Sequence, residues 1–284
     1  MNSMLKPIPN RTTLALLFLV LAGSSVAPVL AQTSSDAATL LDKAIAAPHR
    51  TPAFKARDAY RHPKESLLFF GIRPDSHVAE IWPGAGWYAE ILAPYLRDNG
   101  RYYAAHFHID DKTTDAYRNS RIAFQEKLAK DPALYNRVIV TSVRAPEQTA
   151  LAPRGSLDIV LTFRNVHNWA VESGNDLEMF KAFFDALKPG GVLGVVEHRA
   201  KPGTTLDEMK RSGYMTETYV INLGEKAGFK LGGRSEANAN PKDTKDYAVG
   251  VWALPPTYRF GNVDRQKYAD IGESDRMTLK FVKP

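Results

Sequence analysis

Hydrophobic residues of this chain fall into short runs that alternate with segments of helical spacing. Seven of these runs predict strands, at residues 77–82, 101–107, 137–142, 157–163, 192–197, 229–234 and 276–282. Between the runs, apolar residues recur every three or four positions and predict helices at residues 87–96, 115–130, 175–187 and 216–227. This alternation predicts an α/β fold with a doubly wound, mostly parallel sheet, in a single domain over residues 32–284.

A helical segment, residues 32–75, precedes the first strand and carries a dense polar cluster. Its apolar spacing predicts short helices at residues 36–47, 53–60 and 65–70. Between the last two, Arg57, Asp58, Tyr60 and Arg61 follow one another closely. One interpretation is a lid that binds a substrate carboxylate through Arg57 or Arg61, with Tyr60 beside it. The equally supported alternative is a solvated helix face on which Asp58 and Arg61 pair.

Residues 236–272 form a polar and aromatic insertion before the last strand, and their pattern predicts no regular element. The pattern favours packing of the aromatic stretch from Trp252 to Tyr258 on the sheet edge. The alternative interpretations are a substrate lid and a surface for a partner. Upstream of the insertion, Thr205 and Glu208 have the spacing of a capping box at a helix start.

Residues 1–31 have the features of a secretory signal peptide. Lys6 and Arg11 supply positive charge, residues 14–22 are apolar, and Ala31 ends a small-residue cleavage motif. A bilayer span needs about 20 apolar residues, more than this run offers. We therefore expect cleavage and export, to the periplasm of a Gram-negative bacterium or outside the cell, without stable membrane insertion afterwards. The alternative is an uncleaved N-terminal anchor.

Composition narrows the classes of function. Hydrophobic residues make up 44% and charged residues 24% of the chain, which is typical of a globular protein. There is no cysteine, so thiol nucleophiles, cysteine-ligated zinc, iron–sulfur clusters and disulfides are excluded. The formal net charge of +6 is modest and the basic residues are scattered, so we expect no nucleic-acid partner.

Titratable side chains collect where the predicted strands end. Ligands of doubly wound sheets bind outside the carboxyl ends of the strands. Four of the seven histidines fall at such ends, together with one acidic residue on the first strand: His106, His108, His167, His198 and Glu80. A rim of this kind is typical of an active site, although strand ends also tolerate polar residues because they meet solvent.

Two of these strand ends have unusual sequences. After Glu80, the run Trp82-Pro-Gly84-Ala-Gly86 places two glycines between a strand and a helix, where the backbone can approach a ligand closely. After the fourth strand, three side chains alternate: Asn165, His167 and Trp169. If the extended geometry continues, these three face one side, where His167 can move a proton, Asn165 can orient the substrate and Trp169 can shape the pocket.

The order of elements and the run Pro83-Gly-Ala-Gly-Trp-Tyr88 make the chain resemble class I S-adenosylmethionine-dependent methyltransferases. More narrowly, it resembles exported bacterial proteins predicted to be methyltransferases. The likeness covers roughly residues 53–235 and the last strand. It implies a Rossmann-like, seven-stranded sheet whose last strand is antiparallel.

The resemblance also implies that S-adenosylmethionine is the cofactor and that the first loop packs against it. It assigns cofactor contacts to Glu80, Pro83, Gly84, Gly86, Trp87, Tyr88, His106, Asp110 and Arg164. The sequence departs from the family pattern at Trp82, where a glycine is usual, and at His106, where an acidic residue is usual. Beyond the third strand, Glu147 is the one acidic candidate for an adenine contact.

Two functions follow as hypotheses. The first is an exported methyltransferase acting on a small molecule, with His167 and Asn165 as catalytic residues and Trp169, Arg57, Tyr60, Arg61 and His198 at the substrate. The second is a protein of the same fold that binds a ligand or a divalent metal without catalysis. Its metal ligands would be His106, His108 and Asp110, which alternate along one segment, together with His167. The sequence leaves the methyl acceptor and the oligomeric state open.

Overall fold

The computed structural model describes residues 1, 4, 27–172 and 174–284. The first helix, α1 (Ala27–Ala46), contains the predicted cleavage position Ala31, whereas residues 5–26 of the predicted leader lie outside the described residues. Within the described part of the chain, no helix is both long and apolar enough to cross a membrane.

The sheet has seven strands in the order β3-β2-β1-β4-β5-β7-β6, and the prediction of a Rossmann-like methyltransferase fold is confirmed. Strands β1 to β5 pair in parallel, and β7 lies antiparallel between β5 and β6. Their bounds are β1 His77–Ile81, β2 Arg101–Phe107, β3 Ile139–Val143, β4 Leu157–Phe163, β5 Leu187–His198, β6 Lys230–Ser235 and β7 Arg276–Val282. Because β7 runs backwards, its amino end lies beside the carboxyl ends of its neighbours.

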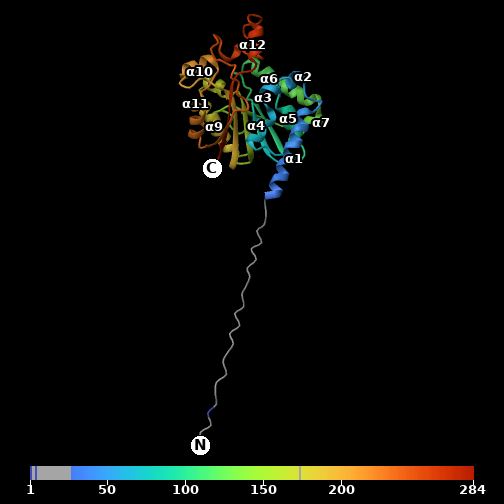
Figure 1. Ribbon diagram of the computed structural model, residues 1–284. Coiled ribbons are helices and arrows are strands. Elements are labelled where there is room, and N and C mark those ends of the chain that lie inside the picture. Colours follow the sequence, from blue (N-terminus) through green and yellow to red (C-terminus); the bar gives the residue numbers. More distant parts are fainter. Residues whose placement is uncertain (2–3, 5–26, 173) are drawn as a thin grey trace.

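Helices cover both faces of this sheet (Figure 1). On one face, α8 (Val166–Glu172), α9 (Asp176–Ala186) and α11 (Glu217–Lys226) bury residues such as Trp169, Phe180 and Leu223. On the other face lie α1, α4 (Pro63–Phe70), α5 (Ala89–Leu96) and α6 (Asp115–Lys130). Both layers follow from the apolar spacing, because each helix turns one hydrophobic side to the sheet.

Helix α6 ends at Lys130 as predicted, and Pro132 then starts the short helix α7 (Pro132–Tyr135), because proline suits the first turn of a helix. Two local predictions were wrong. The expected helix at 53–60 is two short helices, α2 (Pro52–Lys55) and α3 (Asp58–Arg61). The chain after β4 is not extended, since α8 begins at Val166. The capping box is present: Thr205 and Glu208 cap α10 (Leu206–Ser212).

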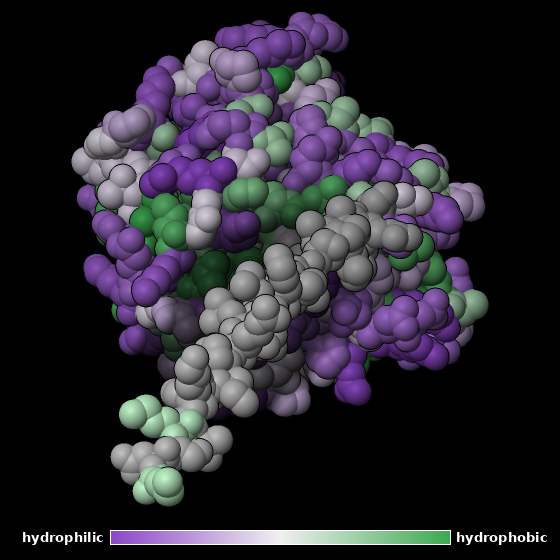
Figure 2. All heavy atoms as spheres, turned by 60° about the horizontal axis from the view of Figure 1, so that its bottom comes forward, coloured by the Kyte–Doolittle hydropathy of each residue, from purple (hydrophilic) through white to green (hydrophobic). Residues whose placement is uncertain are grey.

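The insertion at residues 236–272 lies over the carboxyl ends of the strands, at the top of Figure 1. It contains a 3-10 helix, η1 (Gly250–Ala253), and α12 (Arg265–Ile271). The opposite end of the molecule is mainly hydrophilic, with a band of hydrophobic side chains across its middle (Figure 2).

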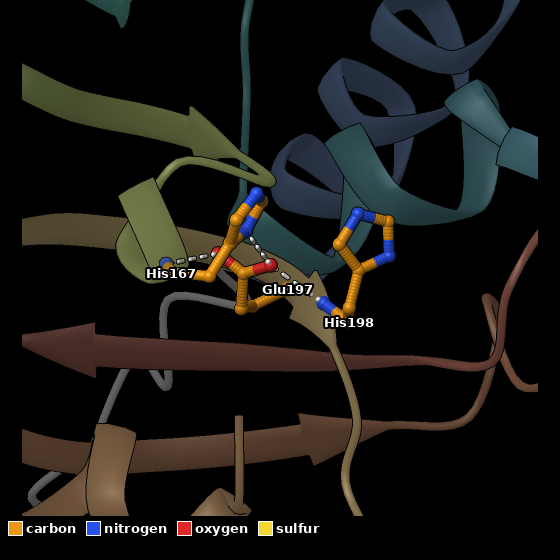
Figure 3. Close-up of side chains that lie close together, drawn as sticks. All are labelled: His167, Glu197 and His198. Carbon is orange, nitrogen blue, oxygen red and sulfur yellow. Dashed lines mark hydrogen bonds and ion pairs between the residues drawn. The ribbon is translucent and has the colours of Figure 1, made fainter. Parts of the chain in front are cut away.

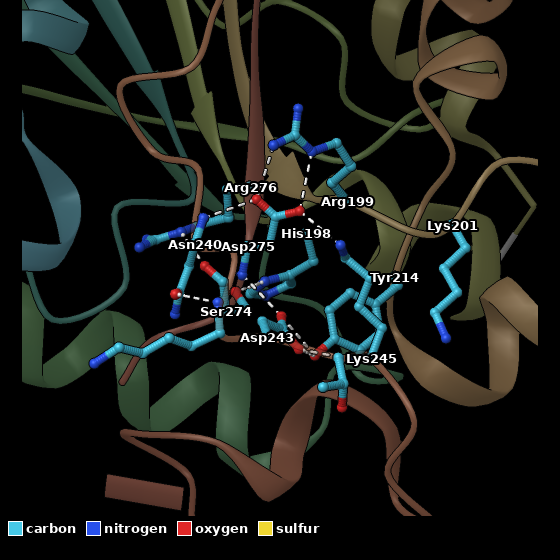
Figure 4. A network of polar contacts seen from close by, with 12 residues as sticks. His198, Arg199, Lys201, Tyr214, Asn240, Asp243, Lys245, Ser274, Asp275 and Arg276 are labelled. Carbon is cyan, nitrogen blue, oxygen red and sulfur yellow. Dashed lines mark hydrogen bonds and ion pairs between the residues drawn. The ribbon is translucent and has the colours of Figure 1, made fainter. Parts of the chain in front are cut away.

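A polar network holds the insertion on the sheet (Figure 4). Arg199, just after β5, donates to both carboxylate oxygens of Asp275, at 2.8 and 3.1 Å. Asp243 of the insertion accepts from the Tyr214 hydroxyl and, at 2.8 Å, from the Asp275 amide. Asn240 donates its backbone amide to Asp275 at 2.9 Å. Burial of these charges is offset by their mutual contacts, so the insertion is fixed in place.

Candidate functional site

Two cavities open at the edge where the parallel strands end. The first, which we call the aromatic pocket, has a volume of about 520 Å³ and lies beyond β1, β2 and β3. Its walls include Trp82, Phe107, His108, Tyr117, Arg144 and Glu147. The Tyr117 and Phe107 rings stack with centroids 4.2 Å apart, and Trp82 packs 4.7 Å from Phe107. The pocket therefore offers flat apolar surfaces with a polar rim.

The glycine loop after β1 contributes Trp82 to the lining of this pocket, and its glycines follow directly after Trp82. Gly84 and Gly86 both have left-handed backbones, with φ of 55° and 81°, which glycine adopts at little cost. A side chain at Gly84 would meet no atom within 4 Å, whereas one at Gly86 would press on Phe124 at 3.1 Å. Trp82 is also left-handed, with φ of 50°, and its indole donates to the Val143 carbonyl at 3.1 Å. Trp82 thus adds an aromatic wall at the position where the resemblance led us to expect a glycine.

Beneath the loop, His106 and Glu80 are buried, and burial favours the uncharged form of each side chain. The Phe107 amide donates to His106 Nδ1 at 2.9 Å, and His106 Nε2 lies 3.2 Å from the Gly84 carbonyl. Burial lowers the pKa of His106 to about 4, so the neutral ring supports the loop. Burial likewise raises the pKa of Glu80 to about 7, despite a 2.5 Å hydrogen bond from the Tyr102 hydroxyl.

Asp110 pairs with Arg144 instead of pointing into open space. The Arg144 guanidinium and the Thr113 hydroxyl both donate to it, and they hold the pKa of Asp110 below its usual range. Glu147 is the acidic side chain that lines the aromatic pocket. It is about half exposed and lies 3.5 Å from Arg144.

The second cavity, which we call the arginine pocket, has a volume of about 310 Å³ and lies beyond β4 and β5. Three cationic side chains line it, Arg57, Arg61 and Arg164, together with His167 and His198. The insertion closes it with Trp252, Pro255 and Pro256. The aromatic stretch of the insertion therefore lies against the site.

One carboxylate, Glu273, sits among the arginines. Arg57 donates to it at 2.5 Å, Arg276 at 3.2 Å and Arg61 at 3.4 Å. Burial opposes ionisation of Glu273, but Arg61, Arg276 and Arg164 prevail and lower its pKa to about 2. Burial lowers the pKa of Arg276 to about 10 and that of Arg61 well below its ordinary value. The site thus concentrates positive charge, and removing these guanidinium groups from water costs solvation free energy.

Arg164 differs from the other arginines. Its backbone amide donates to Val196 at 2.7 Å, but its guanidinium makes no hydrogen bond or ion pair with any residue that the structure describes. Its backbone is left-handed, with φ of 60°, an unfavourable conformation for a side-chain-bearing residue. Burial lowers the pKa of Arg164. The strained backbone of Arg164, and its guanidinium without a partner among the described residues, together indicate that this side chain contacts a ligand.

His167, Glu197 and His198 form a compact group beside the arginines (Figure 3). Glu197 lies buried at the end of β5 and accepts from His167 Nδ1 at 2.9 Å and from the His198 amide at 2.7 Å. A carboxylate at Nδ1 requires the proton there, so Nε2 of neutral His167 carries the lone pair. His198 Nδ1 lies 2.5 Å from the Ser274 hydroxyl. Burial, followed by the charge of neighbouring cations, lowers the pKa of His198 well below its ordinary value.

The same three residues are the group of potential metal ligands among the described residues, with ligand atoms within 4.8 Å of one another. Metal binding there would have to displace the hydrogen bond between His167 and Glu197. It would also place a cation beside Arg61, Arg164 and Arg276, all of which act on His198. The surroundings therefore oppose a divalent cation. The predicted set of His106, His108 and Asp110 does not form such a group.

Several predicted site residues do not reach a cavity. Because α8 begins at Val166, Asn165 turns back and donates to the Ile81 carbonyl at 2.9 Å and to Thr162, tying β1 to β4. Trp169 is buried in the core against Trp82, with its indole N–H unpaired. The expectation that these two share a side with His167 was wrong. Trp87, which donates to Phe54, and Tyr88, which stacks on Phe163, also lie outside both pockets, and Tyr60 lines a neighbouring cavity instead. The predicted cofactor residues that line neither pocket are Glu80, Pro83, Gly84, Gly86, His106 and Asp110.

Sequence reasoning missed Glu273 and Ser274, which line the arginine pocket, and Arg276, which pairs with Glu273 behind it. They precede β7, and an antiparallel strand starts where parallel strands end. The signal was the polar run from Glu273 to Arg276 directly before the last apolar segment. Of the predicted residues, the pocket brings together Arg57, Arg61, Arg164, His167 and His198.

Comparison with known proteins rests on structure alone. No family model and no curated protein matches the sequence. A S-adenosylmethionine-dependent methyltransferase from Aquifex aeolicus matches with a TM-score of 0.51 and 17% identity, over 87% of this chain and 98% of that one. The cyclase SpnF matches with a TM-score of 0.53 and 18% identity, over 88% and 93%. At such identities the likeness establishes the fold, which these two proteins use for different reactions.

Proposed function

We propose that this protein is an S-adenosylmethionine-dependent methyltransferase acting on a small molecule. The observation that carries the proposal is the pairing of a glycine loop and an aromatic pocket at one strand end with a polarised histidine at the next. The strand order and the antiparallel β7 support it. The Aquifex aeolicus methyltransferase supports it by fold.

The aromatic pocket suits the adenosine part of this cofactor. Its volume of about 520 Å³ lies in the usual range for small-molecule sites. Phe107, Tyr117 and Trp82 offer faces on which a flat base can stack. Glu147 is placed to accept from an amino group or a hydroxyl. The open space at Gly84 leaves room for close backbone approach.

S-adenosylmethionine supplies a methyl group activated by a positively charged sulfur. The protein's contribution is to hold the acceptor and to remove its proton. His167 Nε2 takes the proton from an acceptor hydroxyl or amine, and Glu197 stabilises the imidazolium that results through its contact with Nδ1. His198 and Arg164 orient the acceptor from the sides of the arginine pocket.

Calorimetric titration with S-adenosylmethionine, and then with S-adenosylhomocysteine, tests the proposal. We expect micromolar binding to the protein, and binding about tenfold weaker to Glu147→Gln. Asp185→Asn, which removes an exposed acid paired with Arg154, is the matched control and should bind as the unchanged protein does. Absence of binding at millimolar ligand would reject the methyltransferase and leave a ligand-binding protein of the same fold.

We also propose that the protein is exported, on the evidence of its first 31 residues. Lys6, Arg11 and the apolar run that follows them carry this proposal. Fractionation of the bacterium that encodes the protein should find a chain shortened at Ala31 outside the cytosol. A full-length chain in the cytosol would contradict export without bearing on the reaction.

A further inference from the structure

We infer that the arginine pocket selects an organic anion, a small apolar molecule that carries a carboxylate or phosphate group, as the methyl acceptor. That this anion accepts the methyl group rests on the proposed function, whereas the binding of an anion is inferred from the pocket alone. The evidence is a surplus of cationic donors, an unpaired guanidinium and an apolar wall.

The charges around the pocket do not balance. Four guanidinium groups, those of Arg57, Arg61, Arg164 and Arg276, surround the single carboxylate of Glu273. Of the other buried carboxylates at this edge, Glu197 is engaged by His167 and by the His198 amide, and Asp275 is engaged by Arg199. Glu80 also lies close enough for Arg61 and Arg164 to act on it, but burial raises its pKa to about 7, so it offsets little of their charge. Cations gathered in a partly dry cavity repel one another, and an anionic ligand relieves this repulsion.

The guanidinium donors of the pocket are also held in position to bind an anion. Arg61 is 3% exposed, and its guanidinium lies over the Trp87 ring, 4.7 Å from the centroid. Of its nitrogen atoms, Nε alone donates to Glu273, at 3.4 Å. The Arg164 guanidinium has no acceptor among the described residues and lines the cavity. Guanidinium groups bind carboxylate and phosphate oxygens in pairs of parallel hydrogen bonds. The pocket therefore presents a fork of donors fixed by packing before any ligand arrives.

The apolar wall determines what the anion is attached to. Trp252, Pro255 and Pro256 of the insertion line the same cavity of about 310 Å³ as the arginines and supply its apolar part. Trp252 also lies edge-on to His167, with ring centroids 6.3 Å apart. A molecule the size of a substituted benzoate fits this space, its charge on the arginines and its body on Trp252. A hydroxyl or amine on that body then lies within reach of His167.

Ligand binding to the full chain tests this inference, with benzoate, inorganic phosphate and uncharged benzamide as probes. We expect benzoate to bind and raise the melting temperature, and benzamide to bind at least tenfold more weakly. Inorganic phosphate measures the contribution of charge without an apolar body. Phenyl phosphate, which has the same ring as benzoate, distinguishes the two anions: if it binds more tightly than benzoate, the acceptor is a phosphate compound, and if it binds more weakly, a carboxylate. Both results support an anion site.

Arg164→Gln is the decisive variant, and Arg154→Gln, on the exposed surface, is its matched control. Arg164→Gln should bind benzoate at least tenfold more weakly, yet melt at the same or a higher temperature without ligand, because one repelling cation is gone. Arg164→Lys should recover part of the affinity. Equal binding of benzoate and benzamide, or an Arg164→Gln variant that binds as tightly as the unchanged protein, would overturn the inference. S-adenosylmethionine titrated into the same samples separates the two proposals, since its failure to bind would reject the methyltransferase while leaving anion binding measurable.

Discussion

The two pockets at the carboxyl edge of the sheet differ in how their polar groups are satisfied. In the aromatic pocket the charged groups pair with each other: Asp110 with Arg144, and Arg144 with Glu147. In the arginine pocket, Arg164 has no partner among the described residues and three other arginines share Glu273. The aromatic pocket is therefore suited to stacking with a planar ring, and the arginine pocket to binding a negatively charged group.

Under the proposed function, this difference separates a pocket for the cofactor from a pocket for the substrate. A flat, neutral pocket binds a planar ring by burying apolar area, at little cost in stability to the free protein. A pocket of unbalanced charge reduces the stability of the free protein, and binding of an opposite charge restores it. Substitutions in one pocket or the other, and one substitution away from both, test that distinction.

The largest effect is expected for Glu273→Gln. Three arginines lose their shared carboxylate, so the free energy of unfolding should fall by about 3–5 kcal/mol. Phosphate should restore much of this loss, because it replaces the missing charge. Urea denaturation with and without phosphate measures both quantities. Glu236→Gln, which removes an exposed partner of Arg199, should change stability by less than about 1 kcal/mol. Destabilisation that phosphate cannot reduce would contradict the charge argument.

The next effect is a pH dependence at Glu80. Because burial raises its pKa from about 4.5 to about 7, the unfolded chain loses this proton at lower pH than the folded protein does. Stability should therefore fall between pH 4.5 and 7 and level off above, by about 3 kcal/mol for this group. Glu80→Gln should remove that slope, as denaturation at pH 5 to 8 would show. Because Arg61 and Arg164 act on Glu80, anion binding in the arginine pocket should be as tight in Glu80→Gln as in the unchanged protein, or tighter.

A smaller effect is expected at Tyr117 in the aromatic pocket. Loss of a stacking ring in Tyr117→Ala should weaken S-adenosylmethionine binding by about 1–2 kcal/mol, roughly tenfold or more. Tyr117→Phe keeps the ring and should bind nearly as well. Calorimetry with benzoate should detect no change in either variant. A loss of benzoate binding would mean that the two pockets are not independent.

The smallest effect is expected at Thr205, which caps α10 away from both pockets. Thr205→Ala should lower the free energy of unfolding by about 1 kcal/mol, since its hydroxyl accepts from the Glu208 amide at 3.3 Å. Affinity for S-adenosylmethionine and for benzoate should stay unchanged. A change in either affinity would show that stability alone alters the pockets and would weaken every comparison above.

The strands could be predicted from the sequence because the period of apolar residues reports directly on burial. Runs such as residues 101–107 and 157–163 coincide with β2 and β4. The insertion could not be predicted, because its fold depends on contacts such as those of Arg199 with Asp275, 76 residues apart. Local pattern contains no information on such pairs.

At the site, the strand-end rule found His167 and His198 but misjudged their neighbours. The resemblance assigned Arg164 to the cofactor, whereas Arg164 lines the arginine pocket. Asn165 and Trp169 were assigned to the pocket on the assumption of an extended chain, whereas α8 turns both away. Arg61 was an even choice between a lid and a solvated face, and its burial decides against the solvated face. Glu273 and Arg276 escaped because the rule was applied to the ends of parallel strands and not to the start of the antiparallel one.

Contacts between the two ends of the chain have a consequence for biosynthesis. Arg276 donates to the Tyr60 carbonyl at 2.5 Å, and Glu273 accepts from Arg57, 216 residues earlier. The cationic residues before β1 are therefore synthesised long before their counter-charge, and they stay solvated until the last dozen residues have emerged. A chain that stops short of residue 273 would have its sheet incomplete and its arginines unneutralised, so the binding site would fold only after β7 has left the ribosome.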